Sequence, residues 1–111
     1  MASDLNFVEF VADQIDARCD ISYRKMFGEY ALYSGRKVVA LICRNQLFVK
    51  QTAAGRSFIG EAVESPPYSG AKPAFLIEDE IEDREWLTRL ITLTEAELPE
   101  PRPKRKKKSK R

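Results

Sequence analysis

Apolar residues near the start of the chain recur at the three- and four-residue spacing of one helix face. The stripe consists of Leu5, Val8, Val11, Ala12 and Ile15. It predicts a helix over residues 4–18, which Ser3 or Asp4 can cap with a side-chain oxygen. Phe7 and Phe10 widen the stripe, so we expect them to be core residues of a helix that is covered on more than one side.

Between residues 21 and 50 the pattern changes to short apolar runs separated by turn residues, which is typical of a meander of strands. We expect three antiparallel strands, over residues 29–33, 38–43 and 46–50. The run 38–43 is apolar without interruption, and such a run suits a central strand covered on both faces. A helix layer would cover one face, and a second subunit is a candidate for the other.

The second half of the chain predicts a helix, a loop, a strand and a final helix. Residues 52–62 form the short helix, the proline-rich residues 65–73 the loop, and residues 74–77 a buried strand. The last helix begins with an acidic turn at residues 82–85 and ends at Pro99. Together the segments predict a two-layer α+β fold: a helix, a three-stranded antiparallel meander, a helix, a further strand and a C-terminal helix.

Charge divides the chain into an acidic domain and a basic tail. Of the 111 residues, 43% are hydrophobic, which is enough for one compact domain over residues 1–99. Residues 1–100 hold eleven Lys and Arg against seventeen Asp and Glu, a net charge of −6. We expect residues 100–111 to be a disordered arm with eight cations: Arg102, Lys104, Arg105, Lys106, Lys107, Lys108, Lys110 and Arg111.

The basic tail has a partner chemistry of its own. Cationic segments bind polyanions by releasing condensed counterions, so the tail is suited to non-specific contact with nucleic acid. It contains no aromatic residue that would stack on bases. Two alternatives stay open, because a lysine-rich tail also aids solubility or folds back on an acidic domain.

Neither a signal peptide nor a membrane span is predicted. The first residues lack a basic stretch followed by an apolar one, and no apolar run approaches the roughly 20 residues that a membrane helix needs. Cys19 and Cys43 are the two cysteines. We expect them to be reduced and packed as small hydrophobic residues, with a lone disulfide as the alternative. A cytoplasmic protein fits these observations best.

Residues 24–30 read Arg-Lys-Met-Phe-Gly-Glu-Tyr. This segment resembles the Arg-x-Met-Phe-Gly signature of the TfoX/Sxy N-terminal-domain family, named after bacterial regulators of natural competence. Further matches follow in the family's order, over the loop 68–73, the strand 75–77 and the helix start 83–86. The resemblance covers nearly all of residues 5–98 and implies the α+β arrangement given above, but no reaction. In the competence regulators a C-terminal helical domain follows, whereas this chain carries the Lys/Arg arm there.

Seven residues carry the signature and are our candidates for a site: Arg24, Met26, Phe27, Gly28, Lys72, Pro73 and Trp86. We expect a mainly structural role, in which Met26 and Phe27 fill the core beneath the helices. Gly28 would allow a bulge or a close approach of the backbone. Arg24 would pair with an acidic neighbour or, as the functional alternative, form an anion pocket with Lys72 or Arg84.

The sequence lacks the usual signatures of catalysis. There is no His, the commonest general base, and two isolated cysteines without a Cys-x-x-Cys spacing do not make a zinc site. We expect the acidic run at residues 78–83 to be a set of solvated cap residues. The chain is therefore expected to have no enzyme activity, metal or cofactor, and an enzyme with Cys19 or Cys43 as nucleophile is the alternative.

These observations lead to one main hypothesis and one rival. In the main hypothesis the chain is a non-catalytic regulatory interaction module of the TfoX/Sxy N-terminal type that acts through protein contacts and forms a homodimer. In the rival hypothesis it is an accessory protein that binds nucleic acid through the Lys/Arg arm. The partner protein is not identified by the sequence.

Overall fold

The computed structural model describes residues 3–100 and places them in three α-helices, two short 3₁₀ helices and six strands. The predicted α+β class is confirmed. In chain order the elements are α1 (Leu5–Asp13), η1 (Ala17–Cys19), β1 (Ile21–Met26), β2 (Glu29–Ser34), β3 (Lys37–Cys43), β4 (Gln46–Val49), α2 (Ala53–Ile59), β5 (Val63–Ser65), β6 (Ala74–Ile77), η2 (Asp79–Glu82) and α3 (Arg84–Glu97).

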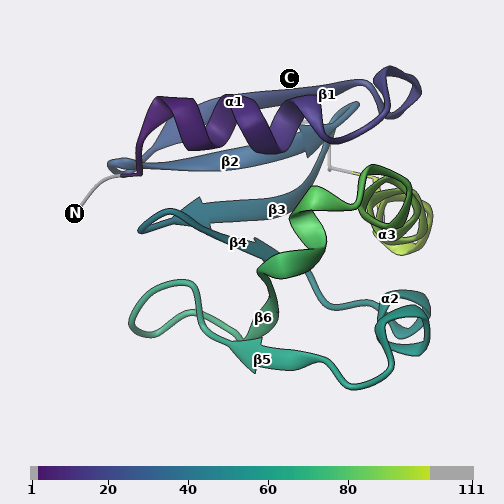
Figure 1. Cartoon of the computed structure of the whole chain (residues 1–111). Helices are drawn as coiled ribbons and strands as arrows, with labels where there is room; N and C mark the ends of the chain where they lie inside the picture. Colours follow the sequence, from purple (N-terminus) through teal and green to yellow (C-terminus); the bar gives the residue numbers. More distant parts are fainter. Residues whose placement is uncertain (1–2, 101–111) are drawn as a thin grey trace, which may run out of the picture.

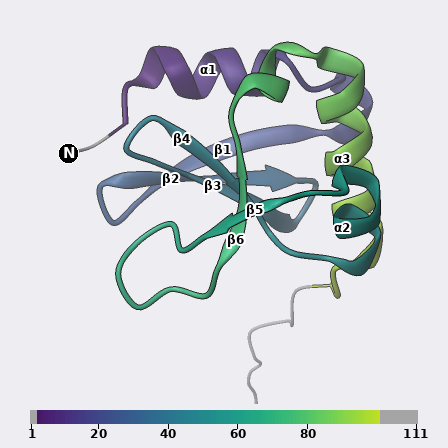
Figure 2. The ribbon, with the colours of Figure 1, turned by 60° about the horizontal axis from the view of Figure 1, so that its bottom comes forward.

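The six strands form one antiparallel sheet in the order β1-β2-β3-β4-β6-β5. β1 to β4 are a meander, and β6 then pairs with β4, which leaves β5 at the edge. Figure 1 shows α1 in front of the first strands and α3 at one end of the sheet. In Figure 2 the helices α2 and α3 lie side by side, and they pack against each other. The helices thus cover one side of the sheet and one of its ends.

The sheet has two strands more than the sequence pattern predicted. The strands expected over residues 29–33, 38–43 and 46–50 correspond to β2, β3 and β4. β1 is an edge strand in which every residue is exposed or half-buried, and its polar residues hide the apolar alternation that marks a strand. β5 has only three residues, too few for a periodic pattern.

The first helix differs from its prediction in length and in anchoring. α1 ends at Asp13 and not at residue 18, and the side chain of its N-cap residue Asp4 makes no cap hydrogen bond. Ser3 does not cap the helix either, because its hydroxyl donates to Glu29 Oε1 at 2.7 Å. Phe10 is 43% exposed, so the expectation that it is a core residue is wrong.

The main core lies between the sheet and the helices. Its members are almost fully buried, and burying one aliphatic side chain of this kind contributes about 1.5–3 kcal/mol. The helices supply Val8, Val11, Leu87, Leu90 and Ile91, and the strands supply Leu32, Ile42, Leu47, Val49, Phe75 and Ile77.

Two side chains fix the start of α2. Thr52 Oγ1 accepts a hydrogen bond from Gly55 N at 2.9 Å. The carboxylate of Glu97, from α3, accepts hydrogen bonds from Ala53 N at 2.8 Å and Ala54 N at 2.9 Å. Three N–H groups that have no partner inside the helix are thereby satisfied. The start of α2 is therefore held both by its own N-cap residue and by a residue of α3.

Both ends of α3 are also fixed by side chains. At its start Asp83 Oδ1 accepts a hydrogen bond from Trp86 N at 3.1 Å. Near its end the buried Lys37 donates from Nζ to the carbonyl oxygen of Glu95 at 2.8 Å. A cation at a helix C-terminus complements the helix dipole. This contact ties the start of β3 to α3.

Cys43 is buried and Cys19 is half-buried, and both are free thiols. The predicted arm over residues 100–111 lies outside the described residues, except for Glu100, whose Oε2 is 3.8 Å from Lys37 Nζ. Within residues 3–100 no helix is long and apolar enough to cross a membrane.

Candidate functional site

One face of the sheet carries a continuous row of side chains across all six strands. Each residue in the row is the cross-strand partner of the next, so all of them point to the same side. The row runs from β1 to β5 through Arg24, Ala31, Leu41, Phe48, Leu76 and Val63. We call the side of the sheet to which this row points the open face.

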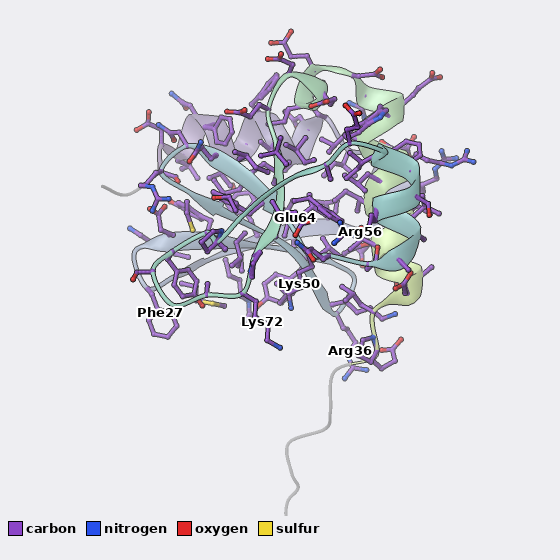
Figure 3. All side chains as sticks on the ribbon, turned by 90° about the horizontal axis from the view of Figure 1, so that it is seen from below. Phe27, Arg36, Lys50, Arg56, Glu64 and Lys72 are labelled. Carbon is purple, nitrogen blue, oxygen red and sulfur yellow. The ribbon has the colours of Figure 1, made fainter. Side chains whose placement is uncertain are left out.

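The open face has a small apolar cluster that is separate from the main core. Cys43, Phe48 and Ala74 are buried in this cluster, and Leu41 and Leu76 pack against them half-buried. Figure 3 shows no helix on this side, which is opposite α1. Pro67 is buried, which indicates that the loop between β5 and β6 folds against the protein. Phe48 is 1% exposed in the single chain, so the expected second subunit is not needed to bury it.

Exposed cations surround the cluster. Figure 3 shows Lys50, Lys72 and Arg36 on the side of the sheet opposite α1. Arg24 lies on the same face, with its guanidinium carbon 5.9 Å from the centre of the Tyr33 ring. Among the described residues no carboxylate lies within salt-bridge distance of these four cations. The open face is therefore basic, although residues 1–100 carry a net charge of −6.

The carboxylate of Glu29, at the start of β2, is already hydrogen-bonded within the fold. Glu29 Oε1 accepts from Ser3 N at 2.9 Å and from Ser3 Oγ at 2.7 Å, and Glu29 Oε2 accepts from Arg44 N at 3.1 Å. Burial acts to raise the pKa of Glu29, but these hydrogen bonds outweigh it and hold the pKa below its usual value. The Glu29 charge is therefore used within the fold.

Phe27 stands at the tip of the hairpin that joins β1 and β2, next to the open face (Figure 3). Met26 pairs with Glu29, so Phe27 and Gly28 form a two-residue turn, with φ values of 51° and 82°. Positive φ at both positions is the type I′ geometry, in which Asn-Gly is preferred because a larger side chain is strained there. The Phe27 side chain is 99% exposed. It therefore occupies an unfavourable backbone conformation without any packing contact that would explain it.

The expected structural role of the signature is wrong for Phe27. Phe27 does not fill the core, and Met26 is 37% exposed beside it. Gly28 forms the hairpin turn in place of a bulge. The prediction failed because β1 was not recognised, and without β1 the Phe-Gly pair could not be read as a turn.

The other signature residues lie in different parts of the fold. Lys72 and Pro73 are exposed in the loop before β6. Trp86 lies in the first turn of α3, where its ring centre is 5.3 Å from that of Phe58, and it packs against the main core. The structural role predicted for Trp86 fits this position.

The anion pocket of Arg24 with Arg84 does not form. Arg84 begins α3, and its guanidinium donates a hydrogen bond to the carbonyl oxygen of Asp13 at the end of α1. Arg24 lies on the opposite side of the sheet, over Tyr33. The acidic neighbour expected for Arg24 is replaced by this aromatic ring.

A hollow runs along α3, between that helix, η1 and the turn between β2 and β3. Its charged groups have both signs, and several are already bound within the chain. Asp83 caps α3, and Asp16 Oδ1 accepts a hydrogen bond from Arg18 N at 3.0 Å. Unlike the open face, this hollow does not present charge of a single sign.

Thiol and metal chemistry find little support in the geometry. Burial raises the pKa of the Cys43 thiol, and the charge of Glu29 raises it further against the opposing effect of Arg44. Such a thiol is a poor nucleophile at neutral pH. In the part of the chain from residue 3 to residue 100, no three His, Cys, Asp or Glu side chains are grouped so that they would hold a metal ion.

The sequence did not indicate that Lys50, Arg36 and the apolar row belong to one surface. Lys50 follows β4. Leu41 on β3 and Leu76 on β6 are 35 positions apart in the sequence. Only the strand order brings them together. The Phe27-Gly28 pair was one usable signal of the site. An apolar residue before Gly in a hairpin turn has no structural advantage there.

Comparisons with known proteins agree with the resemblance in the sequence. A family model described as the TfoX N-terminal domain matches residues 13–98, a range that contains all seven signature residues. A protein of Spirochaeta aurantia, described as an uncharacterized 12.7 kDa protein in the trpE 5′ region, is 39% identical over 107 residues. These residues cover 96% of this chain and 93% of that protein.

Proposed function

Because the chain belongs to the TfoX N-terminal domain family, we propose that it is a non-catalytic regulatory module that binds a protein partner. The proposed binding site is the open face together with the hairpin tip, and Phe27 is its central anchor. The module acts in the cytoplasm, where free thiols such as Cys19 and Cys43 persist. Its resemblance to the competence regulators lies in this domain and does not identify its partner.

The observation that carries the proposal is the state of Phe27. A left-handed conformation costs a residue with a Cβ roughly 1–2 kcal/mol, and the exposed ring recovers nothing from packing in the free protein. Burying a Phe side chain in a partner's pocket would contribute about 1.5–3 kcal/mol. Aromatic anchors of this kind dominate the binding energy of protein interfaces. We therefore attribute the presence of Phe at this turn position to binding.

The neighbouring surface suits such a contact. Val63 is 59% exposed at one end of the row, and Leu41 and Leu76 are half-buried in its middle. Exposed cations lie around these apolar residues. An apolar centre with a polar rim is the usual composition of a protein-binding surface.

Photo-crosslinking at position 27 tests the proposal. The photoreactive analogue p-benzoylphenylalanine would replace Phe27 in cells, with Phe10 as a matched exposed position on α1. We expect a discrete protein adduct from position 27 that excess unlabelled wild-type protein removes and excess Phe27→Asn protein does not. Equal adducts from both positions, or equal competition by both proteins, would contradict the proposal.

The second candidate function is the binding of nucleic acid by the Lys/Arg arm. The basic open face favours it, because its cations would add to the eight in residues 102–111. The test compares the full chain with a truncation after Glu100, which keeps the Lys37–Glu100 contact, on duplex DNA over a range of salt. Loss of affinity and of the steep salt slope in the truncation supports this function, and equal binding dismisses it.

The homodimer is part of the main proposal and has its own test. The cations of the open face would repel each other if two copies met through this face, so a dimer would use another surface. Size-exclusion chromatography with light scattering gives the mass directly. A monomer at high micromolar concentration would remove the dimer from the proposal without affecting the docking site.

A further inference from the structure

We infer that the open face binds an acidic helical segment of the partner protein that also carries an apolar stripe. This inference rests on the proposed function and names the chemistry of its partner. It combines two properties of the open face: the accessible aliphatic side chains Leu41, Leu76 and Val63 of the row, and the cations at its margins. Neither property alone would select this partner.

The distribution of charge supports an acidic partner. Residues 1–100 contain seventeen acids and eleven cations, so a face chosen at random would be acidic. The open face instead presents Arg24, by its pairing with Ala31, and Arg36, Lys50 and Lys72 (Figure 3). Glu29 is held by three hydrogen bonds within the fold. Complementary charge of this kind steers association and selects between partners. An acidic partner is attracted to this face and repelled by the rest of the domain.

The apolar row sets the length and the form of the segment. Neighbouring strands lie about 4.8 Å apart, so the accessible apolar part of the row, from Leu41 on β3 across β4 and β6 to Val63 on β5, is about 14 Å long, which corresponds to about 10 residues of α-helix. Leu41, Leu76 and Val63 would contact one face of that helix. Helices with one apolar face commonly bind to apolar surfaces in this way. Acidic residues on the flanks of the helix would reach the cations.

Two other occupants fit less well. A second copy of this chain would bring the same cations opposite each other. Single-stranded nucleic acid needs several aromatic rings on which successive bases stack. The accessible side chains in the middle of the row are aliphatic, Phe48 is only 1% exposed, and the exposed Phe27 beside the face would stack on a single base. These occupants are therefore outcomes of the test and not alternatives in the inference.

The test uses the full chain and synthetic peptides. The acidic probe is a 16-residue amphipathic helix with Leu on one face and Glu on its flanks, and its control has Gln in place of every Glu. Two variants change the charge equally: Arg24→Glu/Lys50→Glu/Lys72→Glu on the open face, and Lys106→Glu/Lys107→Glu/Lys108→Glu in the tail. The tail variant is needed because the tail also attracts acidic peptides. Circular dichroism and thermal unfolding establish that both variants are folded.

We expect the face variant to bind the acidic peptide about tenfold more weakly than the wild type, since three surface ion pairs are lost. The tail variant should lose much less, and the Gln peptide should bind weakly to all three proteins. In NMR titrations the amide signals of Ala31, Leu41 and Leu76 should shift with the peptide, whereas those of α3 should not.

The inference is overturned if the tail variant loses the affinity, if the Gln peptide binds equally well, or if the shifts lie along α3. It is also overturned if a 16-nucleotide single strand binds through the face cations and the peptide does not. Crosslinking at position 27 distinguishes the two proposals. If that adduct survives in the face variant, the docking site stands and the acidic partner is wrong.

Discussion

Ser3 and Glu29 are joined by two hydrogen bonds to the same carboxylate oxygen, from Ser3 N at 2.9 Å and from Ser3 Oγ at 2.7 Å. These residues are 26 positions apart, so the contact fastens the segment before α1 to the first hairpin. Asn45 N donates to the same Ser3 hydroxyl at 3.0 Å, which adds the turn between β3 and β4. One carboxylate thus organises the sheet edge beside Phe27.

The bonding of Glu29 predicts a dependence of stability on pH. Because its pKa is lowered in the folded state, its contribution is present above the ordinary pKa of glutamate, 4.5, and is lost as the pH falls through the lower folded value. Glu29→Gln should cost about 1 kcal/mol at pH 7, after allowance for solvent screening. Its urea midpoint should fall less than that of the wild type between pH 5 and pH 3 (both values approximate).

The control for this measurement is Glu61→Gln, at an exposed position after α2. The stability of Glu61→Gln should depend on pH as that of the wild type does, because both proteins keep Glu29. Both also keep Glu64 and Glu97, the other two glutamates with a lowered pKa. Parallel profiles for Glu29→Gln and the wild type would show that the Ser3–Glu29 contact does not stabilise the fold.

Phe27→Asn should stabilise the free protein while it removes partner binding. Asn is favoured in a type I′ turn, so we expect a gain of about 1 kcal/mol, or about 4–8 °C in Tm. Thermal unfolding followed by circular dichroism measures this change. Phe10→Asn, on the exposed side of α1, should bring no such gain because Asn is a weaker helix former. A lower Tm for Phe27→Asn would mean that the ring stabilises the hairpin.

Gly55→Ala should destabilise the protein although Ala is the better helix former. A Cβ at this position would lie 2.8 Å from Thr52 Oγ1 and 3.4 Å from both Leu90 and Phe75. Overpacking of this kind costs typically about 1–3 kcal/mol. Urea unfolding should give a lower midpoint for Gly55→Ala, whereas Ser57→Ala, exposed on the same helix, should be neutral or slightly stabilising. Equal midpoints would indicate that α2 and α3 can move apart.

Asp83→Ala should weaken the start of α3 by about 1 kcal/mol, because the N–H of Trp86 loses its acceptor. Asp83→Ser should restore most of the stability, since Ser is an equally good N-cap. Chemical denaturation gives both values. The neighbouring Glu82→Ala serves as the control for loss of one negative charge. If it costs as much as Asp83→Ala, electrostatics and not capping explains the effect.

Cys43 should react slowly with iodoacetamide at pH 8. Burial and the Glu29 charge raise the pKa of its thiol, so little thiolate is present. The half-buried Cys19 should be modified first, and in urea the two rates should become similar. Mass spectrometry of timed samples provides the rates. Faster alkylation of Cys43 in the folded than in the unfolded protein would favour the alternative of a thiol enzyme.

Local patterns were sufficient for those parts of the fold that depend on neighbouring residues. The apolar spacing predicted α1, the uninterrupted run predicted β3, and the segment of residues 74–77 coincides with β6. The start of α3 followed from its acidic first turn, and Asp83 is its cap. Such features are decided by side chains a few positions apart, which a single sequence displays directly.

The tertiary structure alone decided which residues share a surface. β1 becomes a strand because β2 offers it a hydrogen-bonding edge, despite a polar sequence. Because of that pairing, Phe27 lies at the tip of the hairpin, where it is exposed, and not in the core as expected. β6 inserts beside β4, which brings Leu76 next to Phe48 and extends the apolar row. Contacts between distant segments depend on strand order, and no local periodicity records it.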